Sequence, residues 1–160
     1  MKILRPNASS VVKLRGHHLL CILNYGGAGY TPEFIENMSS VVERINQGAA
    51  IQIVSGIDDI CAVLRQGGAV ACAHARTCRA QRVKHRDEIA LQSVTRALSM
   101  PKLKIGSLVR FTKKEVTKLR RFFALNAIRN ACTGCEWHAR CSERAESNFV
   151  GAKLFPPEKV

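Results

Sequence analysis

The most regular pattern of apolar positions begins after Thr31 and continues to Gly48. Thr31 is a residue type that caps helices, and Pro32 suits the first helical position that follows it. Apolar residues then recur at helical spacing, at Phe34, Ile35, Met38, Val41, Val42 and Ile45. This pattern predicts an amphipathic helix that buries one face.

Two further stretches, separated by the helix breaker Pro101, show the same helical period. The first runs from about residue 79 to 98, with an apolar stripe of Ala80, Val83, Ala90, Leu91, Val94 and Leu98. Asp87 falls on this stripe, and a buried carboxylate needs a partner, for which a nearby arginine or histidine is the natural choice. The second begins at Thr112, which forms a capping-box pattern with Glu115 and turns Val116, Leu119 and Phe123 inward.

Shorter segments complete the expected fold. Residues 16–25 are apolar nearly all round, which indicates a short buried helix, and the glycine-rich residues 26–29 end it. The β-branched residues in 51–54 favour a short strand, and residues 55–78 have the composition of a loop. We therefore expect one compact α+β domain over residues 1–160, mainly helical with a short strand element.

The composition is that of a globular protein with a strong positive charge. The longest uninterrupted apolar run, residues 19–23, is far shorter than the roughly 20 residues that a membrane span needs. Residues 1–6 lack the apolar stretch of a secretory signal, so we expect a cytoplasmic location and no membrane partner. The net charge of +13 is concentrated in residues 76–86 and 102–121, and such patches attract phosphates. A nucleic-acid partner is one interpretation, but a solvated basic surface is favoured because aromatic residues that stack on bases are scarce there.

Cys132, Cys135 and Cys141 carry the strongest chemical signal in the chain. They fall within ten residues, in the spacing Cys-x2-Cys-x5-Cys, and Gly134 permits the tight turn that lets thiolates converge. A metal ion or cluster neutralises the charge of thiolates held so close together. The seven cysteines are an odd number, and a reducing compartment disfavours a disulfide framework. The spacing therefore predicts a metal site.

Three thiolates are one short of the usual four ligands, so a donor from elsewhere is expected. The candidates in the preceding loop are Cys61, Cys72, His74 and Cys78. Cys61 and Cys78 bracket this loop, and each lies beside a structured element that can hold it. All-cysteine ligation beside Trp137, which can shield the site from water, favours an iron–sulfur cluster, with zinc as the alternative.

His17, His18 and Cys21 form a second candidate site. On a helix, His17 and Cys21 lie four positions apart and His18 and Cys21 three apart, so both imidazoles neighbour the thiol. The group is consistent with a second metal site, an activated thiol or the wall of a pocket to which Asp87 also belongs. Packed, hydrogen-bonded histidines are an equally good interpretation.

Four motifs stand in order along the chain. They are Leu14-Arg15-Gly16-His17-His18-Leu19-Leu20-Cys21, Asp58-Asp59-Ile60-Cys61, Cys78-x4-Val83-x2-Arg86-Asp87 and Cys132-x2-Cys135-Glu136-Trp137-x3-Cys141. Together they resemble the bacterial and archaeal domain-of-unknown-function family 1284, over about residues 14–154. The resemblance implies a protein that binds an iron–sulfur cluster and whose biochemical role is not established. It places the cysteine pattern of that family on Cys61, Cys78, Cys132, Cys135 and Cys141.

Three hypotheses from different classes follow. The leading one is a small cytoplasmic iron–sulfur protein of the 4Fe–4S type, with a redox or sensing role and a redox partner protein. The second is a zinc-stabilised module that binds nucleic acid through residues 102–121. The third is a thiol enzyme that uses Cys21 with His17 or His18. The sequence indicates no substrate and no catalytic residue beyond these candidates.

Overall fold

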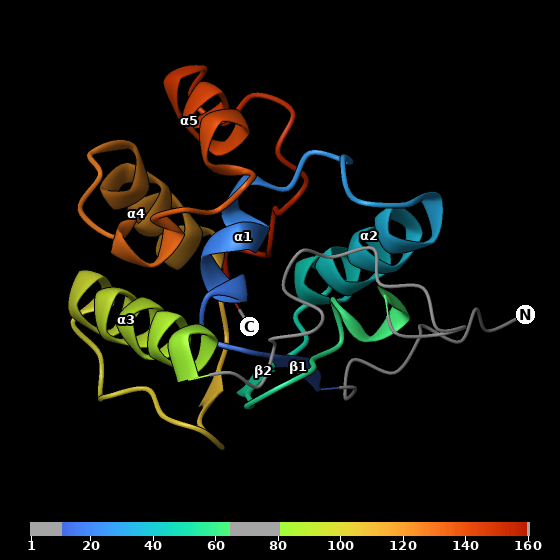
Figure 1. Ribbon diagram of the computed structural model, residues 1–160. Helices are drawn as coiled ribbons and strands as arrows, with labels where there is room; N and C mark the ends of the chain where they lie inside the picture. Colours follow the sequence, from blue (N-terminus) through green and yellow to red (C-terminus); the bar gives the residue numbers. More distant parts are fainter. Residues whose placement is uncertain (1–10, 65–80, 160) are drawn as a thin grey trace, which may run out of the picture.

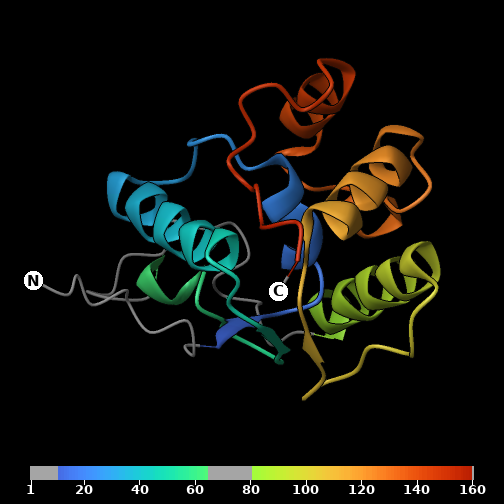
Figure 2. The ribbon, with the colours of Figure 1, turned by 180° about the vertical axis from the view of Figure 1, so that it is seen from behind.

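Helix α1 (His18–Asn24) lies at the centre of the molecule, surrounded by the other helices (Figure 1). The computed structural model describes residues 11–64 and 81–159. Helix α2 (Pro32–Asn46) lies on one side of α1, and the view from behind in Figure 2 shows the same arrangement. On the other side are α3 (Gln81–Leu98), α4 (Lys113–Ala124), the short 3-10 helix η2 (Asn130–Cys132) and α5 (His138–Glu146). None of the described helices is long and apolar enough to cross a membrane.

A three-stranded sheet closes one edge of this helical assembly. Its strands are β1 (Val12–Leu14), β2 (Ile51–Ile53) and β3 (Leu108–Val109), in the order β1-β2-β3. β1 and β2 pair in parallel, and β2 and β3 pair antiparallel. Because parallel neighbours need a crossover, helices α1 and α2 form the connection between β1 and β2. The molecule is a single compact α+β domain, mainly helical, as the sequence predicted.

Most elements expected from the apolar pattern are present. The Thr31 hydroxyl accepts the Phe34 N–H at 3.1 Å and caps α2. The Glu115 carboxylate accepts the Thr112 N–H at 2.8 Å at the start of α4, which confirms the capping box. The helix expected over 79–98 is described from Gln81 onward.

Four elements were not predicted, namely β1, β3, the 3-10 helix η2 and α5. The two strands are three and two residues long, too short for a period of two to stand out. Helix α5 contains no buried residue, so it has no apolar stripe from which a helical period could be recognised.

Helix α1 is mostly apolar because other elements enclose it on most sides. Its apolar residues Leu19, Leu20, Ile22 and Leu23 are almost completely buried, at about 1.5–3 kcal/mol of stabilisation for each such side chain. Asn24 at the end of α1 is also buried, whereas His17, His18 and Cys21 remain partly accessible. The core thus holds α1 in place from several directions while these three residues reach its one open side.

A close approach between backbones positions the start of α1 against α3. A Cβ atom added at Gly16 would lie 2.3 Å from the carbonyl oxygen of Asp87, so only glycine fits between β1 and α1. This contact brings the residues on either side of Gly16, Arg15 and His17, next to the Asp87 carboxylate.

Candidate metal centre

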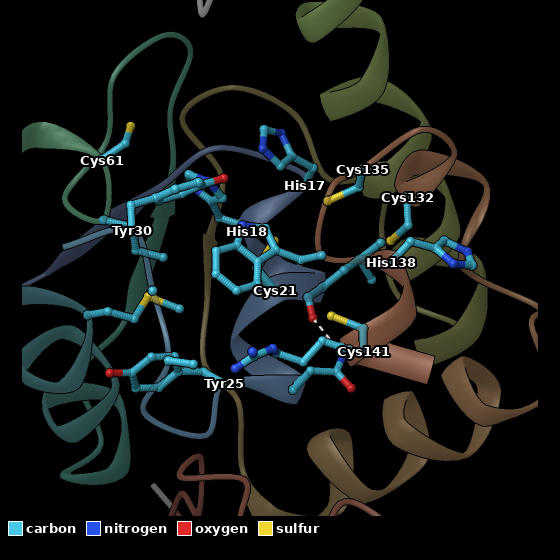
Figure 3. A pocket seen from close by; sticks show the side chains of 18 of the residues that line it. His17, His18, Cys21, Tyr25, Tyr30, Cys61, Cys132, Cys135, His138 and Cys141 are labelled. Carbon is cyan, nitrogen blue, oxygen red and sulfur yellow. Dashed lines mark hydrogen bonds between the residues drawn. The ribbon is translucent and has the colours of Figure 1, made fainter. Parts of the chain in front are cut away.

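All the cysteines in the described part of the chain line one pocket (Figure 3). The elements that supply them are far apart in sequence. Cys21 comes from α1, Cys61 from the turn after β2, Cys132 from η2, Cys135 from the next turn and Cys141 from α5. Each of them is a free, partly buried thiol. The fold therefore gathers thiols from both halves of the chain around a single space.

Residues of the two sites proposed from the sequence line the same pocket. Of the predicted ligands, Cys61, Cys132, Cys135 and Cys141 line the pocket, together with His17, His18 and Cys21 from the second candidate site. Trp137, the residue expected to shield the metal, lines it as well. Cys72, His74 and Cys78 lie outside the described residues.

Cys21 lies within electrostatic range of the three C-terminal thiols. Burial raises the pKa of its thiol well above the usual value, and negative charge on Cys132, Cys141 and Cys135 raises it further. Cys21 therefore stays a thiol at neutral pH unless a positive charge is bound, which disfavours its use as a free nucleophile. A metal ion supplies such a charge.

Cys141 and Cys132 show the same need for positive charge. Burial raises the pKa of Cys141 to about 11, and the charges of Cys132 and Cys135 add to this. Burial also raises the pKa of Cys132, but the neighbouring guanidinium of Arg129 opposes the rise. Arg129 therefore favours a thiolate at Cys132, and Arg86 acts in the same direction.

Arg129 is itself buried and incompletely paired. Its guanidinium donates to the Ser142 hydroxyl at 2.9 Å and to the His138 carbonyl at 3.1 Å, and it lies over the ring of Phe123. Its Nε–H group has no acceptor among the described residues. A buried donor without a partner is costly, so an acceptor from a bound group beside Cys132 would stabilise this arrangement.

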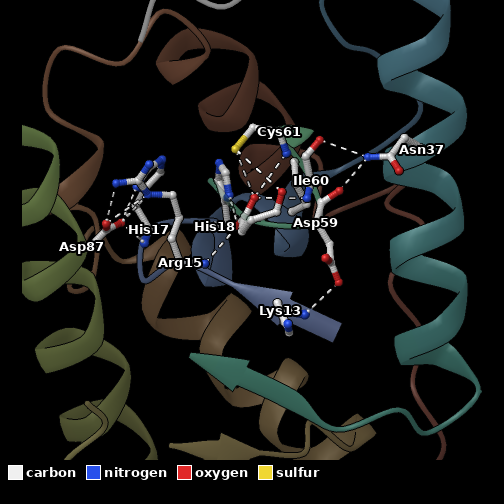
Figure 4. Close-up of polar contacts among 10 residues, drawn as sticks. Lys13, Arg15, His17, His18, Asn37, Asp59, Ile60, Cys61 and Asp87 are labelled. Atoms are coloured by element: carbon white, nitrogen blue, oxygen red, sulfur yellow. Dashed lines mark hydrogen bonds and ion pairs between the residues drawn. The ribbon is translucent and has the colours of Figure 1, made fainter. Parts of the chain in front are cut away.

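Each histidine at the start of α1 is held by a carboxylate (Figure 4). His17 Nδ1 lies 2.6 Å from Asp87 Oδ1, and His18 Nδ1 lies 2.5 Å from Asp58 Oδ2. The two rings are 4.4 Å apart between centroids. Burial and the charge of His18 lower the pKa of His17 to about 4, so a neutral His17 ring donates from Nδ1 and keeps a lone pair on Nε2.

Asp87 has the partners that its position on the apolar stripe predicted. Its carboxylate accepts from Arg15 Nε at 3.0 Å and Nη2 at 2.9 Å, in addition to His17. Burial raises the pKa of this carboxyl, but the hydrogen bonds from His17 and Arg15 outweigh it and hold the pKa below its usual range. The structure thus confirms the ion pair expected from the sequence.

Asp58 has a structural position that the sequence analysis did not recognise. It is 3% exposed and accepts the backbone N–H groups of Arg15 at 2.9 Å, Ile60 at 3.1 Å and Cys61 at 3.2 Å. It also accepts the Cys61 thiol at 3.2 Å. Burial raises the pKa of its carboxyl, yet the charge and hydrogen bond of His18 bring it to about 2. The signal in the sequence was the spacing Asp-x2-Cys, in which an aspartate caps the turn that presents the thiol.

Two kinds of ligand spacing occur in the pocket. Among the described residues, the group of three or more potential ligands with ligand atoms all within 4.8 Å of one another is His18, Asp58 and Cys61. Cys132, Cys135 and Cys141 are spread more widely. A tetrahedral zinc ion with bonds of about 2.3 Å to sulfur needs sulfurs roughly 3.8 Å apart, whereas a cluster of several irons spaces its ligands further apart.

The fold and the pocket define a small α+β protein with a cysteine-rich site. The family model described as "Protein of unknown function (DUF1284)" matches residues 29–141, which is most of the chain. The protein therefore belongs to this family, as the four motifs indicated. Comparison with curated proteins and with solved structures found no match. The description of the family names no ligand and no reaction, so both must be inferred from the site.

Proposed function

We propose that this protein binds an iron–sulfur cluster of the 4Fe–4S type in the cysteine-lined pocket. The observation that carries the proposal is the convergence of thiols from α1, η2, the following turn and α5 on one space. Thiols with raised pKa values gather in this way at little benefit to an apo-protein, whereas a bound cluster stabilises their thiolate forms.

In this proposal, Cys132, Cys135, Cys141 and Cys21 are the four ligands. Cys21 is included because the charges of the other three act on it directly. The pKa of the Cys61 thiol depends instead on burial and then on the charge of Asp58, which together raise it to about 12. The family resemblance implies Cys61 and Cys78 as ligands, and variants of these cysteines separate the two ligand sets.

The surroundings of the three C-terminal cysteines suit a cluster. The unpaired Nε–H of Arg129 beside Cys132 is available to a cluster or thiolate sulfur, and Arg86 adds a second positive charge near Cys132. Trp137 packs edge-on against Tyr30 at 5.2 Å, with Arg140 over its ring, and forms an apolar wall. Such a wall limits the access of water to the site. A cluster supplies one-electron chemistry, so we propose a redox or sensing role with a redox partner protein.

Anaerobic purification tests the cluster directly. We expect a brown protein with broad visible absorption that bleaches on reduction, and about four iron and four sulfide per chain. A colourless protein with one tightly bound zinc ion would instead support the zinc-stabilised module.

Cysteine variants test the ligand set. Replacing Cys132, Cys135, Cys141 or Cys21 by Ala should remove most of the iron and sulfide, because a cluster that lacks one ligand is labile. Cys72→Ala is the matched control, because the cysteine pattern implied by the family resemblance does not include Cys72, and it should keep the parent content. A full complement of iron in Cys135→Ala would refute the site. If Cys21→Ala keeps the full iron content and Cys78→Ala loses it, the fourth cluster ligand is Cys78 rather than Cys21.

A further inference from the structure

His18, Asp58 and Cys61 stand apart from the cluster ligands by their close spacing and mixed chemistry. A nitrogen, a carboxylate oxygen and a sulfur all lie within 4.8 Å of one another, with His18 Nδ1 at 2.5 Å and Cys61 Sγ at 3.2 Å from the Asp58 carboxylate. The three residues come from α1 and from the turn after β2, and Figure 4 shows the side chains of His18 and Cys61 close to each other. Such convergence of three ligand atoms is what a single metal ion requires.

The neighbouring Asp87 and His17 provide a contrast. Both carboxylates are buried and both hold a histidine, but Asp87 also forms an ion pair with Arg15 at 2.9 Å. Among the described residues, the ion pair of Asp58 is with His18 alone. A buried carboxylate is stabilised by a cation, and no arginine or lysine in the described part of the chain forms an ion pair with Asp58. The thiol of Cys61 adds a soft donor beside Asp58, whereas no thiol of the described residues forms a hydrogen bond to Asp87.

We infer that His18, Asp58 and Cys61 form a second metal site, which takes one divalent ion of the zinc or ferrous class. Nitrogen, oxygen and sulfur donors together are typical of these borderline ions, whereas calcium and magnesium prefer oxygen alone. The ion binds where the Nδ1–H of His18 and the thiol proton of Cys61 now face the carboxylate. The thiol proton is released to solvent, and His18 carries its proton on Nε2 instead of Nδ1.

The backbone around Asp58 is already arranged to hold a ligating carboxylate. The N–H groups of Arg15, Ile60 and Cys61 donate to it, and they fix its orientation without occupying the position between Asp58 and His18. His18 and Cys61 both line the cysteine pocket, so the ion faces that pocket. Three protein ligands leave a fourth position for water or for an oxygen donor of a small molecule, as in catalytic metal sites.

Metal titration of the anaerobic protein with its cluster in place tests this inference. After treatment with a mild chelator, the parent protein should bind one equivalent of Zn²⁺, and Co²⁺ in its place should give a thiolate-to-cobalt charge-transfer band. His18→Gln and Cys61→Ala should weaken Zn²⁺ binding by at least about 10-fold to 100-fold. The iron and sulfide contents of both variants should equal those of the parent. Cys61→Ser, which keeps a hydrogen bond to Asp58, should also lose the charge-transfer band.

His17→Gln is the matched control. His17 directly precedes His18 and also forms a hydrogen bond to a buried carboxylate. Its replacement should leave the Zn²⁺ affinity within about threefold of the parent. A parent protein with an intact cluster that binds no Zn²⁺ or Co²⁺ would overturn the inference. Loss of iron and sulfide in Cys61→Ala would also overturn it, because Cys61 would then be a cluster ligand. The proposal that the protein binds a cluster would remain valid in that case. Binding of one Zn²⁺ through Cys61 in a protein without a cluster would uphold the inference and refute the proposed function.

Discussion

Arg15 links the two carboxylates that organise the site. Its side chain is 2% exposed and its guanidinium pairs with Asp87, while its backbone N–H donates to Asp58. A guanidinium buried to this degree depends on its carboxylate partner, because removing one member of a buried pair leaves an uncompensated charge. The positions of His17 and His18 thus depend on Arg15, which lies two and three positions before them in the sequence.

Replacing Asp87 by Asn should therefore destabilise the protein strongly. The substitution preserves shape but leaves Arg15 buried beside a neutral group, so the free energy of unfolding should fall by about 3–5 kcal/mol. Urea denaturation, compared at an unchanged m-value, measures this loss. Glu88→Gln removes an exposed charge from the next position of α3 and should stay within about 0.5 kcal/mol of the parent. Equal stability of the two variants would show that Asp87 contributes no ion-pair energy.

Because the pKa of the Asp87 carboxyl is lowered, we also expect the stability of the protein to change in acid. The pKa of Asp87 is lower in the folded protein than its usual value of 3.8, so its contribution is complete above that pH. As the pH falls below about 3.8, the unfolded chain takes up the proton first and the contribution is lost. The difference in unfolding free energy between parent and Asp87→Asn, measured on metal-free protein, should shrink over this range. A difference that stays constant down to pH 2 would contradict the lowered pKa.

At the scale of elements, α5 is the helix whose attachment depends most on the proposed cluster. It contains no buried residue, and its described links to the rest of the molecule include the Arg129 contacts to His138 and Ser142 and the partly buried Cys141 and Ala145. Helix α2, in contrast, buries Phe34, Met38, Val41, Val42 and Ile45. Apolar burial therefore holds α2, whereas ligation at Cys141 would supply much of what holds α5.

Removal of iron should consequently loosen α5 selectively. Site and local fold form together when ligands come from a weakly packed segment, so amide exchange over residues 130–146 should accelerate at least about tenfold in the metal-free protein. Exchange in α2 should change little and serves as the internal control. Hydrogen exchange with mass spectrometry resolves the two helices. Uniform acceleration across both helices would mean that the metal stabilises the whole domain rather than α5.

At the scale of the whole molecule, the net charge of +13 includes the basic segment 102–121, whose one aromatic residue, Phe111, is buried. Lys113, Lys114 and Lys118 are exposed on α4, but Phe111 and Phe123 beside them are buried in the core. Arg120 is engaged within the fold, since it donates to the carbonyl groups of Leu23 and Leu154 at 3.1 Å. Part of the basic segment 102–121 thus has a structural role.

We accordingly expect no specific binding of RNA or duplex DNA. Non-specific attraction to phosphates should disappear between about 50 and 200 mM salt, because each phosphate contact releases counterions. Fluorescence anisotropy with labelled RNA and DNA measures this. Tight binding that survives 200 mM salt and is lost when Lys113, Lys114 and Lys118 are changed to Glu would show instead that α4 is a nucleic-acid interface.

The sequence alone was sufficient for the features that depend on neighbours along the chain. Helical periods identified α2, α3 and α4, and the residue types at Thr31 and Thr112 identified the starts of two of them. The spacing of Cys132, Cys135 and Cys141 marked three residues that line the pocket, and the position of Asp87 on an apolar stripe required a partner. All of these are local patterns, because capping, helical periodicity and short ligand spacings are set within a few turns of backbone.

Only the tertiary structure decided which distant residues share the site. Cys21 and the C-terminal cysteines are more than 100 positions apart in the sequence, yet they line one pocket because α1 is enclosed by α3, α4 and α5. Asp58 showed no periodic signal, and its importance arises from the convergence of His18, Cys61 and three backbone N–H groups on one carboxylate. Such convergence depends on how helices pack across the core, and packing is determined by the shapes of all the elements together rather than by any one segment.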